Sequence, residues 1–292
     1  MPAVVFGAVT FGLGGIVLAL GAGRGSLRAV TDPATRRWVL LGAASLVVYA
    51  VAFYAALADA GVALGTTVAI GSSPVFAGLV EWSTDGRRVT RRWVVATLVS
   101  VVGMVVVTLA RSEGSGSAGA ASVGAALDAS LVLGLGSALL AGLTYASYSW
   151  AVARGMHAVS GPVALPGGAS VADRASRPGE RGLVGAVFGL AAVPLVVLAV
   201  VGGHAVLGVA SNWPVFVYLA LVPTVLGHSL YAVGLRSVRA SVATLLSLLE
   251  PVVAAVLAVL VVGEHLGAGG WVGIGLVVVG LAALAVPSRG RG

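Results

Sequence analysis

The sequence predicts an all-α polytopic membrane protein built as two half-repeats of opposite orientation. Three observations predict this fold class: the composition, the length and number of the apolar runs, and the one-sided distribution of arginine. Of the 292 residues, 59% are hydrophobic and only 9% are charged, whereas soluble domains carry about 25% charged residues. Cysteine is absent from the chain, which excludes disulfides and thiolate metal sites.

Nine apolar runs approach or exceed the ~18–20 residues that cross the hydrocarbon core as a helix. Such long, continuous runs favour helices over the strands of a membrane barrel. The first run ends in ALGAG, as a signal peptide can, but it lacks a positively charged start, so we interpret it as a helix. The nine runs lie at about 2–21, 38–58, 61–83, 93–110, 131–153, 183–202, 213–233, 240–263 and 270–286.

The arginines give the orientation of these helices. All 17 basic residues are Arg, and if the nine helices alternate in direction, Arg111 lies on one face and the other sixteen on the opposite face. The positive-inside rule places the arginine-rich face in the cytoplasm. We therefore expect a cytoplasmic C-terminus and, for the chain as written, an external N-terminus. The net charge of +7 is explained by this asymmetry, so no nucleic-acid partner is expected.

The chain resembles itself at an offset of 177 residues, which indicates an internal duplication. The matched segments 61–83 and 240–263 are five crossings apart, an odd number, so the two copies have opposite directions in the membrane. Inverted repeats are common in secondary transporters, where the binding site lies near the midplane between the halves. The matches include Tyr54 with Tyr231, Thr67 with Thr244, Pro74 with Pro251, and Gly103 with Gly280.

The duplication predicts the domain organisation. The first half-repeat has four transmembrane helices, whereas the second has five. The counterpart of 131–153 in the first half would precede residue 1, so either the start lies upstream, which we favour, or the helix has been lost. The predicted segments are 1–110 for the first half-repeat, 111–130 for an external linker, 131–286 for the second half-repeat with a cytoplasmic loop at 154–182, and 287–292 for a cytoplasmic tail.

Two stretches resemble the drug/metabolite transporter superfamily and its EamA-like domains. They are SPVFAGLVEW…RRW…VVGMVVV in the first half and LRSVRASVATLLSLLEPVVAAVLAVLVVGEHLGAGGWVGIGLVVVG in the second. The resemblance implies a ten-helix fold of two inverted five-helix repeats, from which this chain lacks the first helix. It also implies transport: mostly export of amino acids or other small metabolites, or uptake or exchange of nucleotide sugars. The chain departs from the family at Arg87, where Glu is frequent.

Glu250 and Pro251 interrupt the apolar run 240–263. A charged residue at the centre of a transmembrane helix costs roughly 2.5–3.5 kcal/mol on insertion scales, so Glu250 indicates either function or a specific partner. Thr244, Ser247 and Glu250 are spaced by three and are predicted to form one polar stripe. The stripe is interpreted either as a proton or substrate site or as hydrogen bonds that pack helices. Helix breaks are expected at Pro251 and at its first-half equivalent, Pro74.

Four further side chains are candidates for substrate binding or proton coupling. His228 and Tyr231 lie three residues apart within one span and share a face, and a neutral imidazole there could bind substrate or relay a proton. The alternative is an interhelical hydrogen bond. Tyr145 lies deeper than Tyr148, which we interpret as a residue of the interfacial aromatic belt. Tyr54 is a weaker candidate, through its equivalence to Tyr231.

No P-loop, dinucleotide fingerprint or nucleophile elbow is visible, and no His, Asp and Glu have the spacing of metal ligands. We therefore expect no enzyme activity, no metal and no cofactor. The sequence favours a secondary active transporter of the cytoplasmic membrane that exports small metabolites such as amino acids by alternating access, with proton coupling as the finer hypothesis. The expected partners are a small-molecule substrate and the lipid bilayer, with a homodimer left open. The alternative is a membrane-embedded binding or assembly protein without transport.

Overall fold

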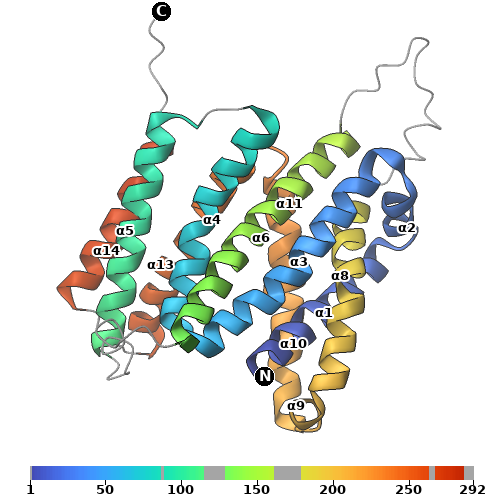
Figure 1. Cartoon of the computed structure of the whole chain (residues 1–292), viewed down its shortest axis with the longest axis horizontal. Helices are drawn as coiled ribbons and strands as arrows, with labels where there is room; N and C mark the ends of the chain where they lie inside the picture. Colours follow the sequence, from blue (N-terminus) through green and yellow to red (C-terminus); the bar gives the residue numbers. More distant parts are fainter. Residues whose placement is uncertain (1, 87–88, 115–128, 161–178, 263–266, 286–292) are drawn as a thin grey trace, which may run out of the picture. The chain divides into compact units, whose positions relative to one another are not determined.

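The structure is a computed structural model that describes residues 2–86, 89–114, 129–160, 179–262 and 267–285, nearly all of them helical (Figure 1). Much of the predicted linker and loop, at 115–128 and 161–178, and the predicted tail lie outside the described residues. The described ends of the loop are helical, because α6 (Ala129–Ser160) extends past residue 154 and α8 begins at Glu180.

The remaining helices follow the predicted spans. Two spans contain irregular turns: the span at 210–234 has a π-helical segment in its middle, and the span at 240–262 has a break and then a π-helical end. In chain order the other elements are α1 (Pro2–Ala22), α2 (Arg24–Thr31), α3 (Pro33–Asp59), α4 (Val62–Asp85), α5 (Arg91–Gly114), α8 to Gly202, α9 (His204–Leu207), η2 (Ala210–Asn212), α10 (Trp213–Leu219), η3 (Ala220–Gly227), α11 (His228–Gly234), α12 (Ala240–Leu246), α13 (Leu249–Leu257), η4 (Ala258–Val262) and α14 (Ala268–Ala285).

The prediction of an all-α polytopic membrane protein is confirmed. Eight helical stretches among the described residues are long and apolar enough to cross a membrane, and Ala268–Ala283 is a shorter apolar helix. The helix α2 was not predicted, because its eight residues are too few and too polar for a span. It packs on α8 and buries Ser26 and Ala29 while its arginines stay exposed.

The helices form two compact units. Unit 1 contains Met1–Ala55 and Ser147–Ala240, and unit 2 contains Ala56–Ala146 and Ser241–Gly292. The chain passes between the units within α3, within α6 and at the start of α12. Each unit therefore combines segments from both predicted half-repeats. The boundaries of the half-repeats themselves stay a prediction.

In unit 1, α1 packs along α8. The two helices are antiparallel, because Gly12 meets Val196 whereas Ala19, farther along α1, meets Gly189 farther back along α8. Their closest approach includes Gly15 and Ala192: a Cβ on Gly15 would lie 2.9 Å from the Cβ of Ala192. These two positions differ by 177, the repeat offset. An antiparallel pair that meets at repeat-equivalent residues is the arrangement that an inverted duplication predicts.

Unit 2 contains a second pair of this kind, α5 and α14, which lie side by side (Figure 1). The hydroxyl of Ser100 donates to the backbone oxygen of Val277 over 3.5 Å, and these positions also differ by 177. Two contacts flank this point symmetrically: Gly103 meets Val277, and its repeat equivalent Gly280 meets Ser100. Glycine permits the close approach of the two backbones, as at other helix crossings in membranes.

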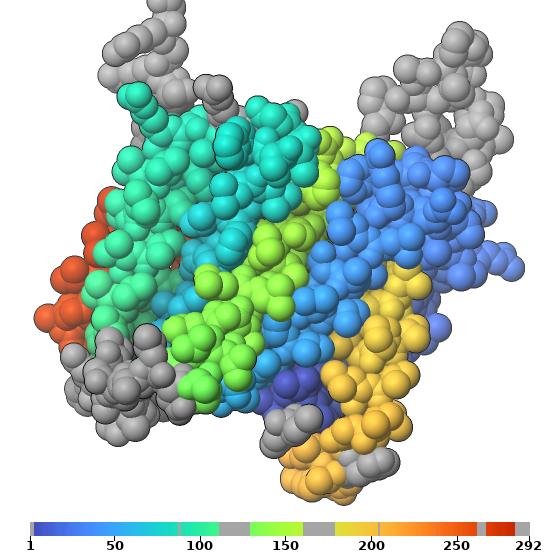
Figure 2. All heavy atoms as spheres, in the orientation of Figure 1, coloured from blue at the N-terminus to red at the C-terminus, as the bar shows by residue number. Residues whose placement is uncertain are grey.

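A third helix covers the first pair. Gly42 of α3 faces the side chain of Val187 on α8, where a Cβ would lie 3.3 Å from both methyl groups. The space-filling view shows α3 and α8 in contact along the visible face of unit 1 (Figure 2). Small residues at these contacts let van der Waals packing hold the helices together, since lipid offers no hydrophobic driving force between them.

The predicted helix break at Pro74 is wrong, because α4 runs through it without interruption. Proline has no N–H and leaves the carbonyl four residues earlier without its helical donor. Here that carbonyl belongs to Ile70, and the hydroxyl of Ser73 donates to it over 2.8 Å. The neighbouring side chain thus replaces the missing backbone bond, and the helix continues.

Candidate functional site

His228 begins α11 directly after the π-helical segment η3. Pro223 lies in that segment and cannot donate to the carbonyl of Leu219, and the hydroxyl of Thr224 donates to it instead over 3.0 Å. The His228 ring bonds back to the same widened turn, with Nδ1 3.1 Å from the oxygen of Pro223. Because a carbonyl only accepts, Nδ1 carries the proton in this bond. The other ring nitrogen, Nε2, is therefore the one that remains for a ligand. Single π-turns in helices are frequent at functional sites.

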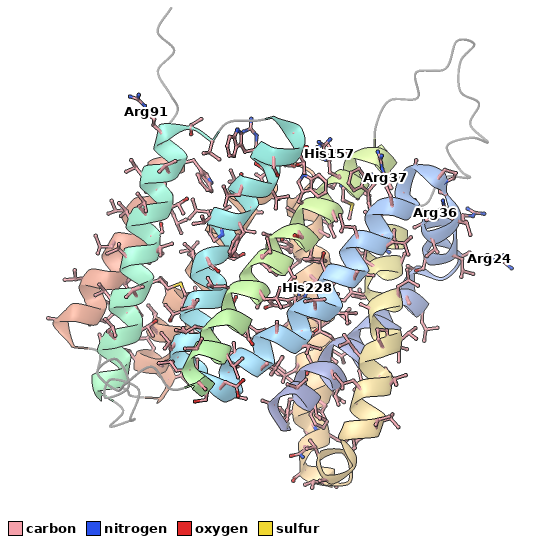
Figure 3. All side chains as sticks on the ribbon, viewed as in Figure 1. Arg24, Arg36, Arg37, Arg91, His157 and His228 are labelled. Carbon is pink, nitrogen blue, oxygen red and sulfur yellow. The ribbon has the colours of Figure 1, made fainter. Side chains whose placement is uncertain are left out.

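An aromatic cluster surrounds this imidazole within unit 1. The ring centroid of His228 lies 4.9 Å from Phe188, 5.8 Å from Phe11 and 6.1 Å from Tyr148, all in edge-on arrangements. Tyr148 is completely buried, so its interpretation as an interfacial residue is wrong. Its partners come from α8 and α11, which sequence proximity does not reveal. Figure 3 shows His228 well inside the bundle, away from the end that carries Arg36 and Arg37.

Tyr231 contacts α6, as His228 does through Tyr148. Its hydroxyl lies 3.0 Å from that of Ser149, the residue next to Tyr148 on α6. The predicted pairing of His228 and Tyr231 on one face therefore agrees with their contacts. Tyr54 also belongs to unit 1 and is half-buried, with its ring lying over Gly7 of α1.

Glu250 lies in unit 2, in the first turn of α13, directly after a break in the helix. The helix break predicted at Pro251 is thus present, and it lies just before the proline, between α12 and α13. The carbonyl of Ser247 loses its usual donor at Pro251, and the N–H of Glu250 takes this place over 3.0 Å. A carboxylate in the first turn of a helix is favoured by the helix dipole. The Glu250 side chain is exposed, and no side chain among the described residues bonds to its carboxylate.

The polar stripe predicted from Thr244 to Glu250 is not one face. Thr244 is fully buried and bonds to the oxygen of Ser241, whereas Glu250 beyond the break is exposed. Ser247 lies in the break and donates to the oxygen of Ala243 over 3.2 Å. Tyr145, the remaining candidate, is half-buried on the part of α6 that belongs to unit 2.

Sequence reasoning missed Glu81, the buried carboxylate of unit 2. Only 5% of the residue is exposed, although it lies one turn from the end of α4. Its carboxylate accepts from the hydroxyl of Ser241 at 2.7 Å and from the backbone N–H of Ser241 at 3.1 Å. The indole N–H of Trp93 donates to the oxygen of the same serine over 3.2 Å. The signal in the sequence was weak: Glu81 directly follows an apolar stretch, but it also lies close to Asp85 and four arginines.

Two kinds of chemistry are therefore available. Unit 1 offers a tethered imidazole in an aromatic surrounding, suited to hydrogen bonding or proton exchange. Unit 2 offers an exposed carboxylate at a helix break within a span. No group of three or more His, Asp or Glu that could hold a metal is found in the described part of the chain.

The antiparallel helix pairs and the interrupted spans define a multi-pass membrane protein of the class in which inverted repeats serve transport. Comparison with known proteins agrees with this class and with the resemblance noted in the sequence. Residues 181–286 match the model of the EamA-like transporter family. This match covers most of the second half of the chain.

A relative and a solved structure extend the similarity beyond that domain. The chain is 29% identical over 251 residues to a Bacillus subtilis (strain 168) protein described as the uncharacterized transporter YwfM, covering 86% of this chain and 74% of the relative. A protein of known crystal structure has a TM-score of 0.72 and 21% identity over 97% of this chain and 87% of its own. At this identity the crystal structure shows a shared fold alone.

Proposed function

We propose that the protein is a secondary active transporter that exports small metabolites such as amino acids by alternating access. The observation that carries the proposal is the pair of repeat-equivalent contacts, Gly15 with Ala192 and Ser100 with Val277. Structures related by an axis in the membrane plane can exchange an outward-open for an inward-open arrangement by exchanging the conformations of their halves. The EamA-like domain and the relative described as a transporter support the same function.

Proton coupling through Glu250 is the finer part of the proposal. A carboxylate inside a span is costly unless it faces water, a substrate or a partner. Glu250 is exposed and lies at a break, where the backbone has already left regular helical hydrogen bonding. Its protonation on one face of the membrane and deprotonation on the other would couple substrate movement to the proton gradient. His228, with Nε2 available, is the second group proposed to contact substrate.

The test uses sealed proteoliposomes and a panel of labelled amino acids, nucleobases and sugars under an imposed pH gradient. We expect one substrate class to move in the direction opposite to protons, and Glu250→Gln to retain substrate exchange while losing the response to the gradient. A Glu250→Gln variant that still followed the gradient would remove the proton role. If no member of the panel moved under any gradient, export of such metabolites would be contradicted.

The alternative is a binding or assembly protein in which the polar groups only pack helices. The bonds of Thr244 and Ser247 to backbone oxygens of their own segment favour this reading for those two residues. Thermal stability of the purified protein separates the functions. A transporter should be stabilised by a substrate of the panel, and substitutions of Glu250 or His228 should abolish that shift without lowering the stability of the free protein.

A further inference from the structure

A pocket of about 380 Å³ lies in unit 1 between α6 and the end of α11. Its lining includes Met156 and His157 from α6, Val233 from α11, and Arg236 and Ser237 from the turn that follows. Small-molecule sites commonly have volumes of about 300–1,000 Å³ and a few polar groups among apolar ones. The proposed transport function uses none of these five residues.

Arg236 gives the pocket its charge. Its Nε donates to Oε1 of Glu180 over 3.0 Å, and its side chain remains 46% exposed. A guanidinium has five N–H donors, and this ion pair is made by one of them. The planar fork of the guanidinium matches the oxygens of a phosphate better than any other side chain does. Arg236 can therefore hold Glu180 and a phosphate group at the same time.

His157 and Ser237 add hydrogen-bonding groups of the right kind. The Nδ1 atom of His157 lies 2.6 Å from the oxygen of Ala153 and donates to it, so Nε2 is the ring atom left for a ligand. The hydroxyl of Ser237 can donate to an anionic oxygen. Met156 and Val233 complete the lining with apolar surface, which suits a ligand that is charged at one end and apolar at the other.

The position of the pocket indicates where such a ligand comes from. Figure 3 shows His157 at the end of unit 1 that also carries Arg36 and Arg37, with His228 farther along the bundle. Arginine-rich ends of membrane helices lie at the level of the lipid headgroups. Basic pockets between such helices are typical binding sites for anionic lipid headgroups.

We propose that this pocket binds a phosphate group, held by Arg236, Nε2 of His157 and the hydroxyl of Ser237, and that an anionic phospholipid supplies it. The glycerol and upper acyl carbons of the lipid would contact Met156 and Val233. The bound lipid would join α6 to α11 and, through Glu180, to α8. This makes the membrane composition a determinant of the stability of unit 1.

The test is lipid binding to the full-length purified protein, measured by native mass spectrometry with phosphatidylglycerol and with phosphatidylcholine. We expect phosphatidylglycerol to bind more tightly, and Arg236→Gln to weaken it about fivefold, the effect of one basic residue at a membrane surface. Arg24→Gln is the matched control, because Arg24 is exposed in the same unit and outside the pocket. Equal phosphatidylglycerol binding by Arg236→Gln and the unchanged protein would overturn the proposal.

Glu180→Gln separates binding from folding. It breaks the same ion pair as Arg236→Gln but leaves the guanidinium free of its competing carboxylate, so phosphatidylglycerol should bind more tightly. Weaker binding in both variants would assign the effect to lost structure and contradict the phosphate site. Glycerol 3-phosphate forms the last arm. Its displacement of phosphatidylglycerol at equal concentration would identify a soluble phosphate compound as the ligand and overturn the lipid assignment.

Discussion

The carboxylate of Glu81 accepts two hydrogen bonds from Ser241, one from its hydroxyl at 2.7 Å and one from its backbone N–H at 3.1 Å. Ser241 is the second residue of α12, so Glu81 satisfies one of the N–H groups that a helix leaves unpaired at its start. Because Trp93 of α5 bonds to the oxygen of Ser241, this one serine connects α4, α5 and α12.

Removal of this contact should destabilise unit 2. Hydrogen bonds to a buried charge contribute about 1.5–3 kcal/mol, so Glu81→Ala should lower the apparent Tm in detergent by several degrees. Ser241→Ala should cost less, since the backbone N–H still reaches the carboxylate. The double variant should lose less than the sum of both. Asp59→Asn, at an exposed position of the same unit at the end of α3, is the control and should leave the Tm unchanged. Additive losses in the double variant would show that the two residues act separately.

Glycine at the α5–α14 crossing should be indispensable at one position and replaceable at another two residues away. A Cβ at position 273 would lie 2.7 Å from the oxygen of Gly103 and from the N of Val107, whereas nothing lies within 4 Å of a Cβ at position 275. Gly273→Ala forces two backbones apart and should cost about 1–3 kcal/mol. Gly275→Ala should be neutral or slightly stabilising, because alanine is the better helix former. Thermal unfolding of the two variants measures this difference in stability. Equal Tm values would contradict the close contact of α14 with α5 at position 273.

The hydroxyl of Ser73 should be needed only while Pro74 is present. Ser73→Ala leaves the carbonyl of Ile70 without a donor and should cost about 1 kcal/mol. Pro74→Ala restores the backbone N–H to that carbonyl. The loss caused by Ser73→Ala should therefore be smaller in the Pro74→Ala background than in the native one. A double-mutant cycle of thermal stability measures this difference, and an identical loss in both backgrounds would rule out the replacement of one donor by the other.

The end of α4 and the end of its repeat equivalent, the span at 240–262, should lie on opposite faces of the membrane. The native chain has no cysteine, so single-cysteine variants can be labelled without further changes. Asp85→Cys at the end of α4 should react with an impermeant maleimide from the arginine-rich face, which we predict to be the cytoplasmic one. Gly267→Cys, just before α14, should react from the other face. Labelling of both from the same side would contradict the inverted arrangement.

The repeat was readable from the sequence, whereas its packing was not. The match of Gly103 with Gly280 at the offset of 177 pointed to a duplication, because both lie in long apolar runs. That α5 and α14 would pack against each other at those glycines depends on contacts between segments more than 160 residues apart.

The candidate side chains show the same limit. Glu250 and Pro251 stood out because a carboxylate and a proline contradict an apolar run, and the structure places a helix break there. Glu81 lies near a charged loop, where a carboxylate is ordinary, so only its contact with Ser241 reveals its burial. The break at Pro74 failed as a prediction because local propensity does not register that the hydroxyl of Ser73 replaces the lost bond.

Alternating access requires that water and substrate reach the middle of a span from both faces, and this access can be tested before any substrate is known. Glu250→Cys is exposed to an impermeant thiol reagent from one face and then, in separate sealed vesicles, from the other. Leu260→Cys on η4 is the control, because Leu260 is 76% exposed and belongs to the apolar surface. We predict that Glu250→Cys reacts from each face and Leu260→Cys from neither. Reaction of Glu250→Cys from one face only, or from neither face, would contradict an alternating-access transporter.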